Sequence, residues 1–197
     1  MPAVDTRLRL RTAALELFVE QGVVETTTRD LAKRAGIAEG TIYRHFESKD
    51  DLVRDLFRDH YVRFGAELNR IQAETAGGID AKLRAMIDFM CRLYDEEPTL
   101  YRFLLLVQHA ALPNIRSAPT SPAVIFRGLV SRAIEQDEIP EQDPGLAASM
   151  VLGSIIQPAL SLIYGSITGT MSSYAPAIAT ACSALLRAPQ GTTVLTH

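Results

Sequence analysis

Between Thr27 and Lys49 the chain carries the side-chain types that bind phosphate and read base edges in duplex DNA. An arginine in the major groove can donate two hydrogen bonds to guanine, and a glutamate can accept one from the amine of cytosine. Hydroxyl, phenol, imidazole and ammonium groups can each donate to a phosphate oxygen. All of these groups occur in one segment, TTRDLAKRAGIAEGTIYRHFESK. The chemistry that this segment indicates is therefore recognition of nucleic acid.

The first part of this segment is predicted to form a short helix. Thr27 and Asp30 stand in a capping-box relation, in which each side chain accepts a hydrogen bond from the backbone amide of the other. Gly36 stands where a helix end needs a left-handed residue, and Ile37 follows it into the core. Local chemistry alone therefore predicts both ends of this helix.

A second short helix is expected over Glu39–Phe46, after a brief turn. Ile42 and Phe46 are four residues apart, so they share one face of that helix and point inward. The side chains left facing outward are those of Glu39, Gly40, Thr41, Tyr43, Arg44 and His45. Two short helices around a turn make a helix-turn-helix, with most of the polar groups on its second helix.

Helices on both sides are expected to complete a small domain. Ser48 and Asp51 repeat the capping pattern and start a new helix directly. Upstream, apolar residues recur at helical spacing until Gly22 ends the first helix. The predicted core of this domain comprises Leu10, Leu17, Phe18, Leu31, Ile37, Ile42 and Phe46.

The run LRTAALELFVEQGVVETTTRDLAKRAGIAEGTIYRHFESKDDLV resembles the N-terminal DNA-binding domain of the tetracycline-repressor (TetR) family of bacterial regulators. The resemblance covers roughly residues 7 to 56, and its paired-residue elements occur without a gap. The chain departs from the usual pattern at Ala38, where a side chain able to cap the second helix is common. The other two thirds of the chain resemble the family only in length and helical character.

The resemblance implies two sets of contacts, one that positions the domain on phosphates and one that reads bases. The implied phosphate contacts are Thr28, Tyr43, His45 and Lys49. The implied base contacts are Arg29, Glu39, Thr41 and Arg44. Gly40 would let the backbone approach the duplex closely, and Lys49 would lie at a helix N-terminus that favours anions.

Other interpretations of these residues remain open at this point. Tyr43 can be a half-buried core aromatic, and His45 can be a solvated surface residue. Lys33 and Arg34 are expected to lie on a solvated face. The three residues Arg7, Arg9 and Arg11 are expected to form a basic arm ahead of the first helix, which either enters the minor groove or is simply exposed.

The net charge is not that of a typical DNA-binding protein. The chain carries a formal charge of −3, whereas nucleic-acid-binding domains are commonly basic. From Arg7 to Lys49, however, eight basic side chains face six acidic ones, a local charge of +2. A positive domain on an acidic chain disfavours indiscriminate coating of DNA.

The remaining sequence predicts an all-α protein of about nine helices. We expect a helix-turn-helix domain over residues 1–50, a helical effector-binding and dimerisation domain over 51–188, and a disordered tail over 189–197. The stretch LAASMVLGSIIQPALSLIYGSI and the alanine-rich helix after it lack a broad polar face, so both are expected to be buried on nearly all sides. By resemblance, these last two helices form the interface of a homodimer.

The same resemblance implies a pocket for a small, mostly apolar effector that relieves repression. The positions proposed to contact the effector are Phe64, Met86, Phe89, Met90, Leu93, Leu104, Gln108, Phe126 and Gln157. Tyr94, His109 and Val130 are further possibilities for the lining or its polar anchors. Each of these is more often an ordinary core residue than a ligand contact.

No catalytic or metal site is predicted, and no cofactor is expected. The chain has no glycine-rich phosphate loop, no nucleophile elbow and no cluster of metal ligands, and its four histidines are scattered. An all-helical enzyme and a regulator controlled by a protein partner remain alternatives. We expect a cytoplasmic protein without a membrane span, since Gly153, Gln157 and Pro158 interrupt its most apolar stretch. Two isolated cysteines suit a reducing compartment.

Overall fold

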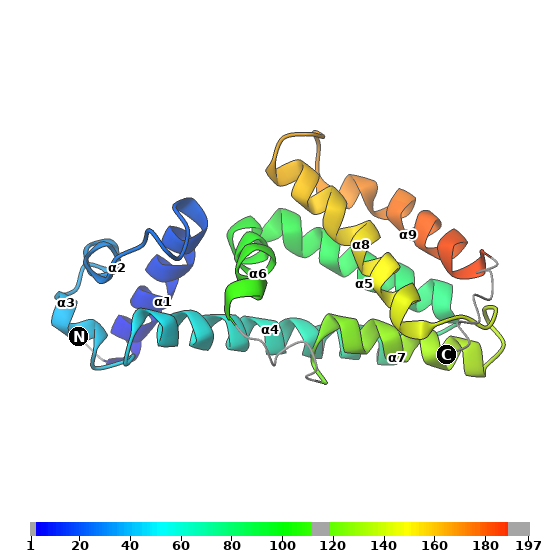
Figure 1. Ribbon diagram of the computed structural model, residues 1–197, viewed down its shortest axis with the longest axis horizontal. Helices are drawn as coiled ribbons and strands as arrows, with labels where there is room; N and C mark the ends of the chain where they lie inside the picture. The colour runs from blue at the N-terminus through cyan, green and yellow to red at the C-terminus, as the bar shows by residue number, and fades with distance from the viewer. Residues whose placement is uncertain (1–2, 112–118, 189–197) are drawn as a thin grey trace, which may run out of the picture. The chain divides into compact units, whose positions relative to one another are not determined.

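The computed structural model describes residues 3–111 and 119–188, without the side chains of residues 3–5 and 106–111. Nine helices and no strands occupy these residues (Figure 1), which confirms the predicted all-α class. The helices are α1 (Ala3–Glu20), α2 (Thr28–Ala35), α3 (Glu39–Ile42), α4 (Lys49–Glu74), α5 (Ile79–Glu96), α6 (Pro98–Ala111), α7 (Pro122–Glu135), α8 (Pro144–Ile163) and α9 (Met171–Arg187). The segment predicted to be a disordered tail lies outside the described residues.

The chain forms two compact units. Unit 1 contains residues 1–64 and 96–118, and unit 2 contains residues 65–95 and 119–197. Helix α4 contributes its N-terminal part to unit 1 and its C-terminal part to unit 2, and α6 belongs to unit 1. The boundary predicted at residue 50 separates a DNA-binding region from an effector-binding and dimerisation region. The two compact units do not test this division of function, so it stays a prediction.

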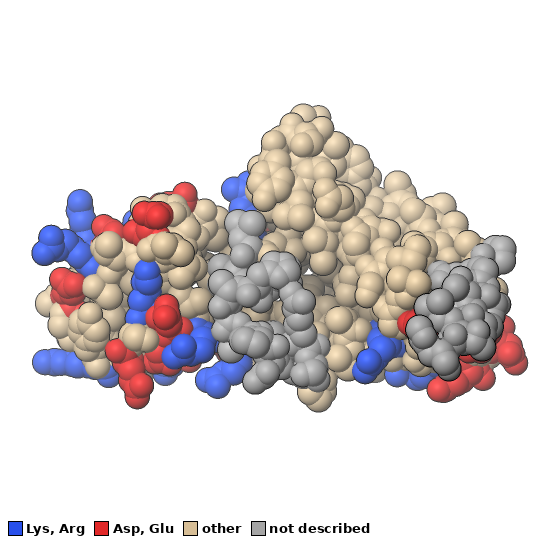
Figure 2. All heavy atoms as spheres, in the orientation of Figure 1, with Lys and Arg blue, Asp and Glu red and all other residues tan. Residues whose placement is uncertain are grey.

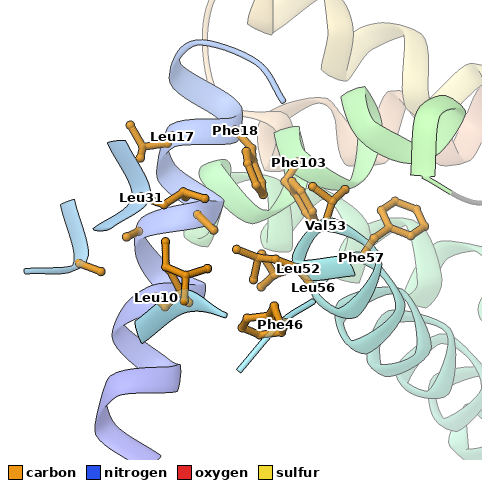
Figure 3. Packing of buried hydrophobic residues seen from close by; sticks show 14 of the residues in the cluster. Leu10, Leu17, Phe18, Leu31, Phe46, Leu52, Val53, Leu56, Phe57 and Phe103 are labelled. Atoms are coloured by element: carbon orange, nitrogen blue, oxygen red, sulfur yellow. The ribbon is translucent and has the colours of Figure 1, made fainter. Parts of the chain in front are cut away.

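The core of unit 1 joins the first three helices to α4 and α6. Leu10, Leu31 and Ile42 are almost fully buried there, each exposing 1% of its surface or less. Aromatic rings continue the core, because Phe103 of α6 lies 6.3 Å from Phe18 and 6.2 Å from Phe57 between ring centroids (Figure 3). Six of the seven predicted core residues belong to this cluster, and the seventh, Ile37, is partly buried and packs against it.

The predicted ends of α2 are confirmed. The hydroxyl of Thr27 accepts a hydrogen bond from the backbone amide of Asp30 at 3.2 Å, and the Asp30 carboxylate accepts one from the Thr27 amide at 3.0 Å. Gly36 follows the helix with φ of 62°, a conformation that costs glycine little. The Ser48 hydroxyl likewise accepts from the Asp51 amide at 3.1 Å, at the start of α4.

The second helix of the motif is shorter than predicted. Helix α3 ends at Ile42, whereas the sequence predicted a helix as far as Phe46. The backbone amides of Arg44 and His45 donate to carbonyls three residues earlier, at 3.2 and 2.9 Å, so the chain tightens into turns. Such three-residue bonds commonly close the last turn of a helix. The side chains after Ile42 are therefore presented by a tight turn.

In unit 2, α8 packs against both α7 and α9. The carboxylate of Asp143 accepts from the Leu146 amide at 2.7 Å and caps the start of α8. Asp95, at the end of α5, binds the first turn of α9 and accepts from the amides of Met171 and Ser172 at 2.8 Å each. Burial raises the pKa of the Asp95 carboxyl, but these hydrogen bonds outweigh it, and the pKa lies below its usual value.

Helices α8 and α9 are less buried within the chain than the sequence predicted. Leu146 and Met150 of α8 expose 53% and 41% of their surface, and Gln157 is also exposed. The helix runs unbroken through Pro158, and by length and composition alone it would qualify as a membrane span, with 28% of that stretch buried. Core helices of soluble proteins meet the same criterion. The apolar residues that α8 leaves exposed are a surface that a partner can cover.

A close approach inside unit 2 requires glycine in the middle of α4. A Cβ atom at Gly65 would lie 2.8 Å from the carbonyl carbon of Thr120, and closer still to its oxygen. Backbone atoms cannot rotate away as a side chain can, so a larger residue at this position would force the two segments apart.

Candidate nucleic-acid interface

Most of the predicted contact residues of α2, of α3 and of the turn after α3 lie on the surface of unit 1. Arg29, Glu39 and Gly40 are exposed, as is Arg44. Tyr43 exposes 56% of its surface, which rules out the interpretation of this residue as a core aromatic. Thr28, Thr41 and His45 are partly buried.

Two arginines on this surface have unused donors. Among the described residues, neither Arg29 nor Arg44 has an ion pair or a hydrogen bond to its guanidinium group. Arg34 differs, because it bridges α2 to α1 through Glu16 at 3.0 Å and Glu20 at 2.6 Å. The hydrogen bond from Arg34 lowers the pKa of the Glu20 carboxyl. Arg29 and Arg44 are thus available for an external acceptor, whereas Arg34 is engaged within the domain.

The predicted basic arm is wrong, because its residues belong to α1. Arg9 donates to the backbone carbonyls of Ala35 and, at 3.1 Å, Gly36. These carbonyls lie at the C-terminal end of α2, where a cation is favoured. Arg9 therefore fastens α1 to α2 and does not extend toward a duplex.

The other two arginines of this group fasten α1 to α4. Arg11 forms ion pairs with Asp55 and, at 2.5 Å, with Asp59. Arg7 pairs with Asp55 at 3.2 Å, and its guanidinium carbon lies 5.3 Å from the centroid of the Phe46 ring. Because Arg11 is only 17% exposed in this pairing, the interaction is less screened than a typical surface ion pair.

Lys49 binds the chain itself. Its ammonium donates to the carbonyl oxygens of Val23 at 2.7 Å, Val24 at 3.2 Å and Thr26 at 2.8 Å. An ammonium has three N–H donors, so these acceptors use all of them. Lys49 holds the loop between α1 and α2 against the start of α4, and its contact with phosphate stays a prediction.

Thr28 and Glu39 bind each other. The hydroxyl of Thr28, the first residue of α2, donates to Oε1 of Glu39, the first residue of α3, at 2.7 Å. Ala38 precedes α3 and offers no side-chain cap, as the sequence indicated. This bond links the starts of the two helices of the motif, and the spacing of eleven residues gave no signal of it.

Two arginines that the sequence did not single out lie near His45. Arg54 and Arg58 line a cleft of about 190 Å³ together with His45, Arg7 and Asp55. Arg54 is 51% exposed, and its only ion pair within residues 3–111 and 119–188 is a long one of 3.8 Å with the aspartate three residues before it. The spacing of four residues places both arginines on one side of α4, and it is the signal that could have found them.

The proposed effector contacts are divided between the two units. Met86, Met90 and Phe126 are buried in unit 2, while Gln157 is exposed on α8. Phe89 lines a shallow cleft with α4, and Leu93 is partly buried. The positions in unit 1 are Phe64, which is partly buried, Leu104, which packs on the core cluster, and Gln108. The side chains of Gln108 and His109 lie outside the described residues.

Residues 10–56 match the family described as "Bacterial regulatory proteins, tetR family". This segment belongs to the TetR family. The match spans the helix-turn-helix and its flanking helices, from the core residue Leu10 of α1 to Leu56 of α4. The identification rests on the same segment that carries the free arginines, the exposed tyrosine and the Thr28–Glu39 bond.

Curated relatives are similar mainly over this domain. The transcriptional repressor KstR2 of Rhodococcus jostii is 43% identical over 87 residues, 41% of each chain. YvkB of Bacillus subtilis is 35% identical over 69 residues, 35% of this chain and 36% of its own. The chain thus spans about two fifths of the length of these two relatives. A fatty acid metabolism regulator of B. subtilis matches further, at 29% identity over 73% of this chain and 76% of its own.

Solved structures share the fold of most of this chain. The fatty acid degradation regulator FadR of Bacillus halodurans has a TM-score of 0.75, at 19% identity, over 89% of this chain and 97% of its own. FadR of B. subtilis, solved in complex with stearoyl-CoA, has a TM-score of 0.73, at 22% identity, over 91% of this chain and 97% of its own. At such identities the likeness establishes the fold.

We predict that Lys49→Met destabilises the protein. The methionine keeps an apolar side chain of similar length but leaves three carbonyls without their donor, and such losses cost about 1–3 kcal/mol. Chemical denaturation followed by circular dichroism measures the change. The control is Lys33→Met at an exposed position of α2, which should leave the denaturation midpoint unchanged. Equal midpoints for both variants would contradict the structural role of Lys49.

Proposed function

We propose that this protein is a transcription regulator that represses its targets by binding a palindromic DNA operator as a homodimer. The observation that carries the proposal is the pair of unpartnered arginines, Arg29 and Arg44, beside exposed Tyr43 on a TetR-type helix-turn-helix. A guanidinium that keeps its donors free can bind guanine with two hydrogen bonds. The Tyr43 hydroxyl, Thr28 and His45 would hold the domain on phosphates, which fixes its orientation.

Helices α8 and α9 supply the proposed dimer interface. Exposed positions on α8 (Leu146, Met150, Gly153, Gln157) and on α9 (Ser173, Ala177, Thr180, Ala181, Ala184) recur at helical spacing. The face of the molecule over these helices carries almost no charged groups (Figure 2). Small residues let helices approach closely, and the exposed apolar groups gain from burial. A two-fold dimer would present two motifs to an inverted repeat.

A small, mostly apolar effector is the proposed signal. The likeness to B. subtilis FadR, whose structure holds stearoyl-CoA, supports a ligand with a long apolar chain. Phenylalanine and methionine side chains of α5 and α7, including Met86, Met90 and Phe126, would surround such a chain, and methionine adapts well to irregular ligands. To relieve repression, the ligand must bind the DNA-incompetent state more tightly than the DNA-competent one.

We expect Tyr43→Ala and Arg44→Ala to weaken DNA binding in different ways. An operator is first selected from a random duplex pool, and affinities are then measured by fluorescence anisotropy at several salt concentrations. Tyr43→Ala loses an uncharged phosphate contact, so it should weaken binding to all sequences alike and leave the salt slope unchanged. Arg44→Ala loses a base contact, so the free-energy preference for one base at one operator position should fall by about 1–3 kcal/mol. Failure of the wild-type protein to select any sequence would overturn the proposal.

Ala177→Glu should convert the dimer to a monomer. The substitution places a charge on the uncharged face of α9, where a close helix contact would bury it without a partner. Sedimentation velocity measures the change in mass. Ala123→Glu, an exposed site on α7, is the matched control and should stay dimeric. If the α9 variant keeps the dimer mass, the interface lies elsewhere.

Stearoyl-CoA should raise the melting temperature of the wild-type protein and release it from its operator. A ligand present at about a hundred times its dissociation constant stabilises the state that binds it by about 2.7 kcal/mol. Thermal melting and anisotropy with labelled operator provide the two readouts, and coenzyme A without the acyl chain is the control. A protein that binds the operator but responds to neither compound in either assay would contradict an acyl-chain effector and favour regulation by a protein partner.

A further inference from the structure

The hydroxyl of Thr28 has two competing acceptors, the carboxylate of Glu39 and a phosphate of the DNA. Thr28 is a proposed phosphate contact and Glu39 a proposed base contact, yet in the free protein they bind each other at 2.7 Å. A threonine hydroxyl has a single proton to donate. A phosphate oxygen can only accept, so the Thr28 hydroxyl can serve Glu39 or the phosphate at one time, but not both.

The carboxylate of Glu39 adds a second obstacle to nonspecific binding. Glu39 is exposed, and its only hydrogen bond among the described residues is the one from Thr28. A phosphate that approaches Thr28 must therefore also approach a negative charge, and like charges in a desolvated contact are costly. A cytosine amine in the major groove would remove this obstacle, because it donates a hydrogen bond to the carboxylate.

The fold holds both residues in place for this exchange. Thr28 follows the capping box of Thr27, which fixes the start of α2. Glu39 stands one turn before Ile42, whose side chain is 1% exposed in the core. The two helices thus present the bonded pair at adjacent ends, and only the side chains need to move.

We propose that the Thr28–Glu39 hydrogen bond is a specificity lock, which releases the Thr28 hydroxyl to a phosphate only when Glu39 meets a cytosine amine. The inference rests on the proposed DNA-binding function and deepens it. On a non-cognate duplex Glu39 keeps the hydroxyl, and the phosphate contact is not made. On the operator, the contact of Glu39 with cytosine and the contact of Thr28 with phosphate form together. The phosphate contact therefore depends on the base sequence, although phosphate groups are the same in every sequence.

The test is a double-mutant cycle with Thr28→Val, which removes the hydroxyl and keeps the shape, and Glu39→Ala. Affinities are measured by anisotropy on the selected operator and on a shuffled duplex, after circular dichroism has confirmed that each variant is folded. On the operator, Thr28→Val should weaken binding roughly tenfold in the wild-type background. On the shuffled duplex, Thr28→Val should change the affinity by less than about twofold in the wild-type background. In the Glu39→Ala background, it should weaken binding to the same duplex roughly tenfold.

Glu47→Ala is the matched control, because Glu47 is an exposed acidic residue of the same domain without a bond to Thr28. Glu47→Ala removes the same charge as Glu39→Ala. In the Glu47→Ala background, Thr28→Val should leave the affinity for the shuffled duplex unchanged. Equal effects of Thr28→Val on that duplex with and without Glu39 would overturn the lock, as would the same unmasking by Glu47→Ala. A wild-type protein that binds no duplex would instead refute the proposed function itself.

Discussion

The recognition surface depends on a helix that cannot be stable alone. Helix α3 has four residues, far fewer than an isolated helix needs in water. Its shape comes from burial: Ile42 and Phe46 enter a core completed by Leu52 of α4 and by Phe103 of α6, which is distant in sequence. The core contacts of Ile42 and Phe46 therefore fix the backbone of α3 and of the turn after it. This backbone in turn positions the side chains that face outward.

The positive charges of unit 1 divide into those that build the domain and those left for a ligand. Arg9, Arg11, Arg34 and Lys49 all bind carbonyls or carboxylates and connect α1, α2 and α4. Arg29 and Arg44 have no such partner among the described residues. Because of this division, a chain of net charge −3 can still present guanidinium groups whose donors are free. The division also favours selective over indiscriminate binding, because affinity for any phosphate backbone rises with the number of free cations.

Local chemistry allowed the sequence to predict the helices and their caps, whereas contacts between distant residues escaped it. The caps by Thr27 and Ser48 could be predicted because each acts on an amide three residues away. The ties made by Arg9 and Lys49 join residues more than twenty positions apart, so Arg9 was mistaken for an arm and Lys49 was assigned only to phosphate. Gly65 is required by Thr120, which no local pattern reveals. The DNA contacts and the effector contacts stay predictions, since each depends on a molecule outside the chain.

Hydroxyl-radical footprinting on DNA upstream of the protein's own gene shows where the short recognition segments contact the duplex. We expect two symmetric blocks of protection on an inverted repeat, with centres about one helical turn apart (roughly 10 base pairs) or a multiple of it. Uniform protection along the fragment, or none at low salt, would show that the helix-turn-helix does not recognise an operator.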